Sequence, residues 1–297
     1  MLLITQIGGL IQTSLTSTTL AARTATTGDF TDGIASVAVA GTAWLIFMIP
    51  HSVGTVSIAT AYFTRMSEHA HAKKFDLLKV DLRQALRSIL AISAIATAVM
   101  IVAAFPIARV FAFEYQPTLA LGLVLIALMI GLVPFSINFM LQRVFYALED
   151  TRSPFIFTTI QIALFVVGAY VCASTVSAMQ LVAAISLVMS VSFAIQALLA
   201  YLLLKRRIGS LKELRLLGYG VQVGAAALTA GIGGFAVLYL LGGFAEGTFA
   251  VSSGLNALIS CGAIGGTAVA VYVSLLWLAG NAEVRSVVSA IRGIVRR

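Results

Sequence analysis

Residues 181–204 read LVAAISLVMSVSFAIQALLAYLLL, an apolar stretch without a charged side chain. A helix needs about 20 mostly apolar residues to cross the roughly 30 Å hydrocarbon core of a bilayer, because each residue advances it by about 1.5 Å. The runs that meet this criterion are Leu2–Ala22, Ile34–Phe63, Ile89–Phe111, Leu119–Leu141, Phe155–Ser174, Leu181–Leu204, Gly218–Leu241 and Leu255–Ala279. The sequence therefore predicts an all-α polytopic membrane helix bundle of about eight transmembrane helices.

The composition supports a membrane protein. Of the 297 residues, 60% are hydrophobic and 10% are charged, whereas a soluble domain has about 45–50% apolar and roughly 25% charged residues. The excess apolar surface must face lipid. A membrane β-barrel would show segments of about 10 residues that alternate between apolar and polar, and the continuous runs exclude that pattern.

The basic residues lie in alternate loops. If the first run begins inside, all of the 19 Lys and Arg residues except Arg23 and Arg109 lie on the inner side. The positive-inside rule then predicts a multi-pass membrane protein with both termini cytoplasmic. The net charge of +8 thus reflects topology, and without a Cys/His finger or an aromatic-basic stripe it predicts no nucleic-acid partner.

The runs divide the chain into three parts: a six-helix lobe (1–217), a glycine-rich helix pair (218–280) and a basic cytoplasmic tail (281–297). Within the lobe, residues 66–88 are charged but carry apolar residues at helical spacing, namely Phe75, Leu78, Leu82, Leu86 and Ile89. This spacing predicts an amphipathic helix on the inner leaflet; the alternative is a solvated connector.

The glycine-rich pair contains two GxxxG motifs, Gly220–Gly224 and Gly262–Gly266. Such spacing lets helix backbones approach closely. The alternative interpretation is that the small residues leave a shallow lipid-facing groove.

Two runs are interrupted by proline at corresponding positions, Pro50-His51 in the second and Pro134 in the fourth. Proline removes a helix hydrogen bond and kinks the helix. A pair of broken helices in matching positions is typical of the central site of a transporter. For His51, the alternative is a hydrogen bond to a loosened carbonyl.

Other polar residues extend this candidate substrate pathway or gate. Gln12 and Thr16 lie in the first run, whose polar side either hydrogen-bonds to other helices or lines a cavity. Asn138, Gln142 and Arg143 continue the fourth run toward its inner end. The complete set of candidates is Gln12, Thr16, Pro50, His51, Pro134, Asn138, Gln142 and Arg143.

No catalytic chemistry is encoded in a recognisable form. The chain has no HExxH, GxSxG or P-loop motif, and no Asp, Glu or Lys is expected well inside a run, so we predict no catalytic residue, no metal site and no cofactor. Transport would then draw its energy from a cation gradient or the membrane potential.

The inner end of the fourth run reads QRVFYALEDTRSP over residues 142–154. This stretch resembles the R-x-F-Y-A-L-x-D-T-x-x-P signature of the MurJ (MviN) family of lipid II flippases. The matching residues are Arg143, Phe145, Tyr146, Ala147, Leu148, Asp150, Thr151 and Pro154. The segment Leu45–Pro50 resembles the proline-centred helix of that family, and Phe63–Ser67 resembles its exit into the cytoplasm. From the residues alone, Asp150 and Thr151 can cap the next helix, and the turn is either a rigid hairpin or a contact for lipid phosphate.

The resemblance implies a fold of fourteen spans in two six-helix lobes plus two final helices. This chain matches the second lobe with its two appended helices, so the resemblance implies a missing N-terminal lobe as partner. It further implies that membrane lipids and the lipid-linked peptidoglycan precursor are bound, that alternating access flips the precursor, and that the glycine-rich pair accommodates its isoprenoid tail. The membrane that the resemblance implies is the bacterial cytoplasmic (inner) membrane. Two positions depart from the family: Leu45 occupies the place of an arginine, and the first run has no acidic residue.

Two rival functions are weighed against a flippase. A drug or polysaccharide exporter of the same superfamily shares the helix plan but carries the 142–154 motif poorly. A non-transporting membrane scaffold is favoured by the scarcity of charge in the middle of the runs.

Overall fold

The computed structural model describes residues 13–14, 17, 37–112, 114–211 and 214–281. Its helices are α2 (Val37–Pro50), the π-helix η1 (His51–Val56), α3 (Ser57–His71), α4 (Phe75–Val102), α5 (Ala104–Phe111), α6 (Tyr115–Met129), α7 (Leu132–Ala147), α8 (Arg152–Thr175), α9 (Ala178–Ile208), α10 (Leu216–Leu240), α11 (Phe249–Ser252) and α12 (Gly254–Leu278). No strand occurs in these described ranges.

Six helical segments are long and apolar enough to cross a bilayer, and the bent pair α6–α7 makes a seventh if its halves form one span. They correspond to seven of the predicted runs, which confirms the all-α membrane bundle. The first run, Leu2–Ala22, lies almost wholly outside the described residues, as does the tail from residue 282.

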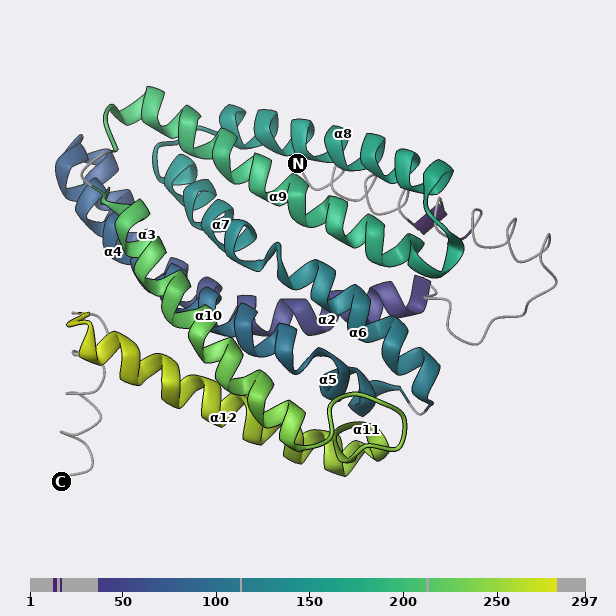
Figure 1. Cartoon of the computed structure of the whole chain (residues 1–297). Helices are drawn as coiled ribbons and strands as arrows, with labels where there is room; N and C mark the ends of the chain where they lie inside the picture. The colour runs from purple at the N-terminus through teal and green to yellow at the C-terminus, as the bar shows by residue number, and fades with distance from the viewer. Residues whose placement is uncertain (1–12, 15–16, 18–36, 113, 212–213, 282–297) are drawn as a thin grey trace.

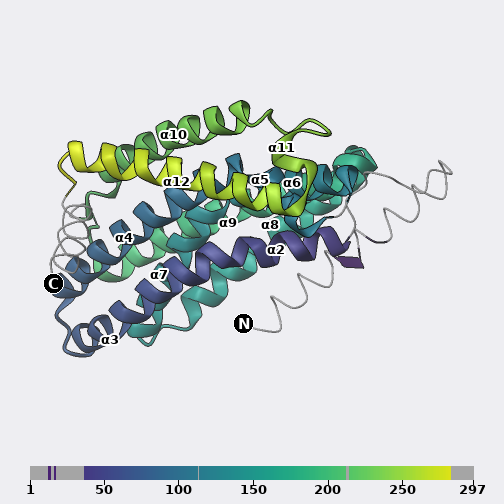
Figure 2. The same ribbon diagram turned by 90° about the horizontal axis from the view of Figure 1, so that it is seen from below.

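Consecutive long helices run in opposite directions, as Figure 1 shows, and α4 packs on helices at two sides. One side of α4 packs on α3 and α7, and α7 in turn packs on α9, which pairs with α8. The other side of α4 packs on α10, which pairs with α12 along one flank of the bundle (Figure 2). The described Lys and Arg residues other than Arg109 lie in the turns α3–α4 and α7–α8, in the helix halves next to these turns, and in or just after the end of α9; we refer to this end, at the left of Figure 1, as the basic end.

The structure corrects the prediction for residues 66–88. Residues 66–71 complete α3, and residues 75–88 form the first half of α4, which continues without a break to Val102. Leu78, Leu82 and Leu86 are fully buried against α3 and α7 rather than lying on lipid. The apolar face was predicted correctly, but its partner is protein.

The third span begins and ends earlier in the chain than predicted, because residues 75–88 belong to the same helix, α4. The predicted run Ile89–Phe111 is divided at Ala103, and the separate helix α5 follows with Pro106 inside it. Because α4 already gains its length from residues 75–88, it reaches the opposite end of the bundle by Val102.

The break in the fourth run lies between α6 and α7, which are bent by 45°. Pro134 has no N–H for the carbonyl of Ile130, so the hydrogen-bond ladder fails one turn before the proline. The Ser190 hydroxyl of α9 donates to the carbonyls of Ala127 and Leu128 at 2.6 and 3.2 Å. A Cβ on Gly131 would lie 2.9 Å from the Ser190 Cα, so the break depends on glycine at this crossing.

The final helix pair is attached to the lobe at both ends. Near the basic end, Arg87 of α4 lies over the ring of Tyr219 at 4.6 Å, and the Tyr272 hydroxyl donates to the Ala91 carbonyl at 2.7 Å. At the opposite end, Arg109 of α5 donates to the carbonyls of Val251 and Ser252 at 2.7 and 3.3 Å.

The GxxxG glycines do not form the contact between α10 and α12. A Cβ added at Gly220, Gly224, Gly262 or Gly266 would meet nothing within 4 Å, whereas one at Gly234 would lie 3.2 Å from Ile264. The close approach is therefore made by Gly234 with Ala230 and Ala268, and the two motifs face open space.

Candidate functional site

The two broken spans meet in the middle of the bundle. Immediately after Pro50, the chain forms η1, and the first residue of this π-helix is His51. The Nδ1 atom of His51 lies 3.3 Å from the hydroxyl oxygen of Ser136, two residues after Pro134. Thr55 donates to the same hydroxyl at 2.9 Å. Since π-helical turns are frequent at functional sites, this junction is the first element of the candidate site.

Aromatic rings enclose the junction. The ring centroids of Phe135 and Phe139 lie 4.6 and 5.1 Å from that of His51. Phe135 also contacts Trp44, Phe47 and Phe193, which belong to the core around α2, α6 and α9. The imidazole is consequently 2% exposed.

Asn138 lies on α7, two residues after Ser136. Its side chain is buried, and its Oδ1 atom has no hydrogen-bond partner among the described residues. An unpaired buried amide oxygen carries a desolvation penalty of about 1–3 kcal/mol. Asn138 is therefore a buried acceptor without a described partner in the same helix as Ser136.

Arg143 continues the site toward the basic end. Its guanidinium lies 4.8 Å from the ring centroid of Phe139 and 5.9 Å from that of Phe63. Cation–π contacts of this kind position an arginine without neutralising it. These two ring contacts position the Arg143 guanidinium near the end of α7.

The turn between α7 and α8 is built by the motif residues. Glu149 adopts a left-handed conformation (φ 57°), and the N–H groups of Glu149 and Asp150 donate to the carbonyls of Tyr146 and Phe145. This is the Schellman pattern that ends a helix. The Asp150 carboxylate then accepts from the backbone N–H and the hydroxyl of Ser153 at 3.0 and 2.8 Å.

Asp150 thus caps α8, as its place in the motif predicted, whereas the Thr151 side chain makes no capping bond. Burial alone would raise the pKa of Asp150, but the Ser153 hydrogen bonds, the backbone of Arg152 and the charge of Arg207 lower it below its ordinary value. Pro154 is the third residue of α8, where its missing N–H costs nothing.

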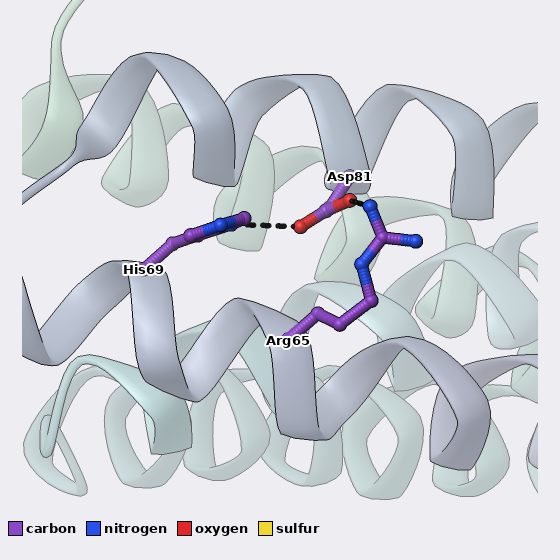
Figure 3. Close-up of polar contacts among 3 residues, drawn as sticks. All are labelled: Arg65, His69 and Asp81. Carbon is purple, nitrogen blue, oxygen red and sulfur yellow. Dashed lines mark hydrogen bonds and ion pairs between the residues drawn. The ribbon is translucent and has the colours of Figure 1, made fainter.

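Sequence reasoning missed a second polar cluster, which Figure 3 shows between α3 and α4. Asp81 of α4 is 1% exposed, and its two oxygens accept from Arg65 at 2.6 Å and from His69 at 2.9 Å. Arg65 is 59% exposed and also lies over Tyr62. The available signal was Asp81 on the apolar face of 75–89, but assigning that segment to the membrane surface placed Asp81 in water.

The predicted site residues fall into three groups. The structure places His51, which follows Pro50, against the turn of α7 that follows Pro134, whereas Asn138, Gln142 and Arg143 lie further along α7 toward the basic end. Gln12 and Thr16 lie outside the described residues. Leu45, where the resembling family has an arginine, is 70% exposed on α2.

The fold and site define a multi-pass α-helical membrane protein with two proline-broken spans that converge on a polar junction. A family profile described as "Lipid II flippase MurJ" matches residues 1–259. The chain therefore belongs to the MurJ lipid II flippase family, which confirms the resemblance in the 142–154 motif. That family consists of transporters rather than catalysts, in agreement with the predicted class.

A solved structure has the same fold. The structure titled "Lipid II flippase MurJ, inward closed conformation" matches with a TM-score of 0.66 and 20% sequence identity, covering 92% of this chain. The chain spans 50% of the length of that protein. No curated protein matches the chain significantly.

Proposed function

We propose that this chain supplies the second half of a flippase that moves lipid II across the bacterial cytoplasmic membrane by alternating access. The observation that carries the proposal is the family match over residues 1–259. The convergence of two broken spans on one junction supports it, because helices interrupted near the midplane form transporter sites.

A first lobe is the proposed partner. The solved MurJ chain is about twice as long as this one, and α2 and η1 present an apolar stripe of Leu45, Ile49 and Val53 that is well exposed. This stripe lies on the same broken span as His51. Docking of another helical lobe there would place the junction beside a central pathway.

Membrane lipids are the proposed ligands of the final pair. The open faces at Gly220, Gly224, Gly262 and Gly266 lie on helices with exposed large apolar residues, among them Leu228 and Ile232. Small residues beside bulky ones make a shallow apolar groove, which suits a long isoprenoid tail.

The orientation in the inner membrane is part of the proposal. The basic end would face the cytoplasm, because Lys and Arg favour that side, and both termini would lie there. Single cysteines replacing Lys73, Lys205 and Glu246, in a chain with Cys172→Ser and Cys261→Ser, test this with a membrane-impermeant thiol reagent. Positions 73 and 205 are expected to react from one side and position 246 from the other; labelling of 73 and 205 from opposite sides contradicts it.

Complementation tests the function. Expressed alone in cells depleted of their own flippase, the chain is expected to fail to restore wall synthesis, whereas co-expression with a first lobe of a family member is expected to restore it. Full rescue by the chain alone would overturn the requirement for a partner lobe. Absence of rescue with every first lobe, while both parts are present in the membrane, would overturn the flippase.

A scaffold without transport is the second candidate, favoured by the exposed Leu45 in the place of an arginine. The substitution Leu45→Arg separates the two, with Val53→Arg as a matched control on the same stripe. If the chain is part of a flippase, the Leu45→Arg variant is expected to restore wall synthesis at least as well as the unsubstituted chain. The Val53→Arg variant is expected not to restore it. A scaffold gives no lipid II translocation with any of these variants.

A further inference from the structure

His51 is a buried ionisable side chain midway along the span Val37–His71. Ionisable groups at this depth are rare and usually functional, because lipid does not compensate their charge. Neither its proline neighbour nor its aromatic contacts require an imidazole. The hydrogen bond to Ser136 is the contact that depends on a nitrogen of the imidazole.

The hydroxyl pair can form a hydrogen bond with both the neutral and the protonated form of His51. Thr55 donates to the Ser136 oxygen, so the Ser136 hydrogen is available to the Nδ1 atom of a neutral imidazole. When Nδ1 takes up a proton, the N–H donates to Ser136 instead, whose oxygen has a second lone pair. Proton uptake therefore reverses the direction of the hydrogen bond that joins η1 to α7.

Two aromatic rings lie beside His51, whose burial disfavours its charged form. Phe135 and Phe139 lie within the roughly 6 Å over which a cation is attracted to an aromatic ring. They can partly replace the water that burial removes.

The elements packed against η1 offer no carboxylate near His51 in the described part of the chain. α2 has no charged residue, and on α7 the charged group nearest along the chain is Arg143, which contacts the same Phe139 ring. On α3 and α4 the charged residues lie toward the basic end: Arg65, Glu68, His69, His71, Asp76, Lys79, Asp81, Arg83 and Arg87. At the level of η1, α4 presents Ile92, which would meet a Cβ on Gly54.

We propose that His51 is a proton-binding site whose occupancy sets the packing of η1 against α7. Because it joins the two broken spans, a proton there would couple the movement of these spans to a proton gradient. This coupling rests on the proposed function, while the proton site itself does not.

Proton binding is tested on the full chain in lipid nanodiscs without any transport. With ¹⁵N-labelled histidine, the imidazole signals are followed between about pH 4 and pH 8, and His51→Gln identifies the signal of His51. The expected result is one signal, absent in His51→Gln, that changes from neutral to doubly protonated within this range. A His51 signal that stays neutral while the chain remains folded overturns the proposal.

Ser136→Ala and Thr55→Val keep the imidazole and alter its hydrogen bonds. Both are expected to shift the midpoint of the His51 titration, because each changes the acceptor that Nδ1–H uses. Ser93→Ala is the matched control, since Ser93 is buried but donates to Ile89 of its own helix. Equal midpoints in all three variants and the wild type overturn the role of the hydroxyl pair.

Coupling is tested in liposomes that contain the chain and a first lobe. A proton gradient of one pH unit, worth about tenfold for one proton, is expected to change the lipid II flipping rate of wild type and Ser93→Ala but not of His51→Gln. Equal responses of wild type and His51→Gln overturn the coupling. No flipping by wild type under any gradient contradicts the proposed function instead, and the imidazole titration still decides the proton site.

Discussion

At the scale of single residues, Asp81 is the one buried carboxylate among those that the structure describes. Both of its oxygens are paired with residues of α3. A buried charge that loses a partner is destabilising, whereas removal of the whole ion pair is often close to neutral. The cluster therefore fixes α3 against α4 rather than adding much net stability.

Arg65→Ala is expected to lower the free energy of unfolding by about 1–3 kcal/mol, because the Asp81 charge loses its exposed partner. Combining Asp81→Leu with Arg65→Ala is expected to recover a large part of the lost free energy of unfolding. Thermal unfolding in detergent measures both. Arg152→Ala, an exposed position, is the control and is expected to stay within about 0.5 kcal/mol; additive losses for the pair would contradict this interpretation.

Gly131→Ala tests the crossing of the α6–α7 break with α9. The new Cβ would lie 2.9 Å from backbone of Ser190, and overpacking of this kind costs about 1–3 kcal/mol. Gly224→Ala, with open space around its Cβ, is expected to be neutral or to stabilise by about 0.5–1 kcal/mol. Unfolding temperatures compare the two, and equal shifts would argue against a close crossing.

At the scale of elements, the α7–α8 turn carries most of the motif, and its role in the structure is local. Asp150→Ala removes the cap of α8 and is expected to cost about 0.5–2 kcal/mol. The pKa of Asp150 is lower in the folded chain than its ordinary value near 3.9. The capping contribution is therefore present above about pH 4 and is lost as the pH falls through the folded pKa.

Unfolding of wild type and Asp150→Asn at neutral pH and at about pH 3 measures this contribution. The difference between the two proteins is expected to shrink at the lower pH. Glu246→Gln, in the exposed α10–α11 connection, is the control and is expected to show no such change. A difference that stays constant with pH would show that the cap acts without its charge.

The ends of α3 and α7 place Lys73 and Glu149 in left-handed conformations, where the ends of α10 and α12 have Gly242 and Gly280. A residue with a Cβ costs roughly 1–2 kcal/mol there. Glu149→Gly is therefore expected to raise the free energy of unfolding, while Glu68→Gly inside α3 is expected to lower it by about 1 kcal/mol, and thermal unfolding compares the two. Destabilisation by Glu149→Gly would mean that its side chain has a role beyond the turn.

At the scale of the whole molecule, apolar run length predicted the fold well, because a membrane span needs a fixed number of residues. The run-length criterion failed for residues 66–88, where charged side chains lie on helices that pack against other helices. Arg83 and Arg87 made residues 66–88 look like a surface helix, yet the first half of α4 packs on α3 and α10.

The candidate site was predictable only in outline. Pro50 and Pro134 indicated the two breaks, but the bond between His51 and Ser136 depends on how α7 is rotated after Gly131, which no spacing in the sequence reveals. The sequence predicted Asn138 and Arg143 as candidate residues, but it did not predict which side chains surround them. The Asp81 cluster was missed because its partners come from another helix.

Arg109 has a consequence for biogenesis. It is the single cation that the structure describes away from the basic end, and two of its acceptor carbonyls, those of Val251 and Ser252, follow it by 142 and 143 residues. These two hydrogen bonds can form only after α11 has been synthesised, so the final attachment of α5 depends on helices that the ribosome makes much later.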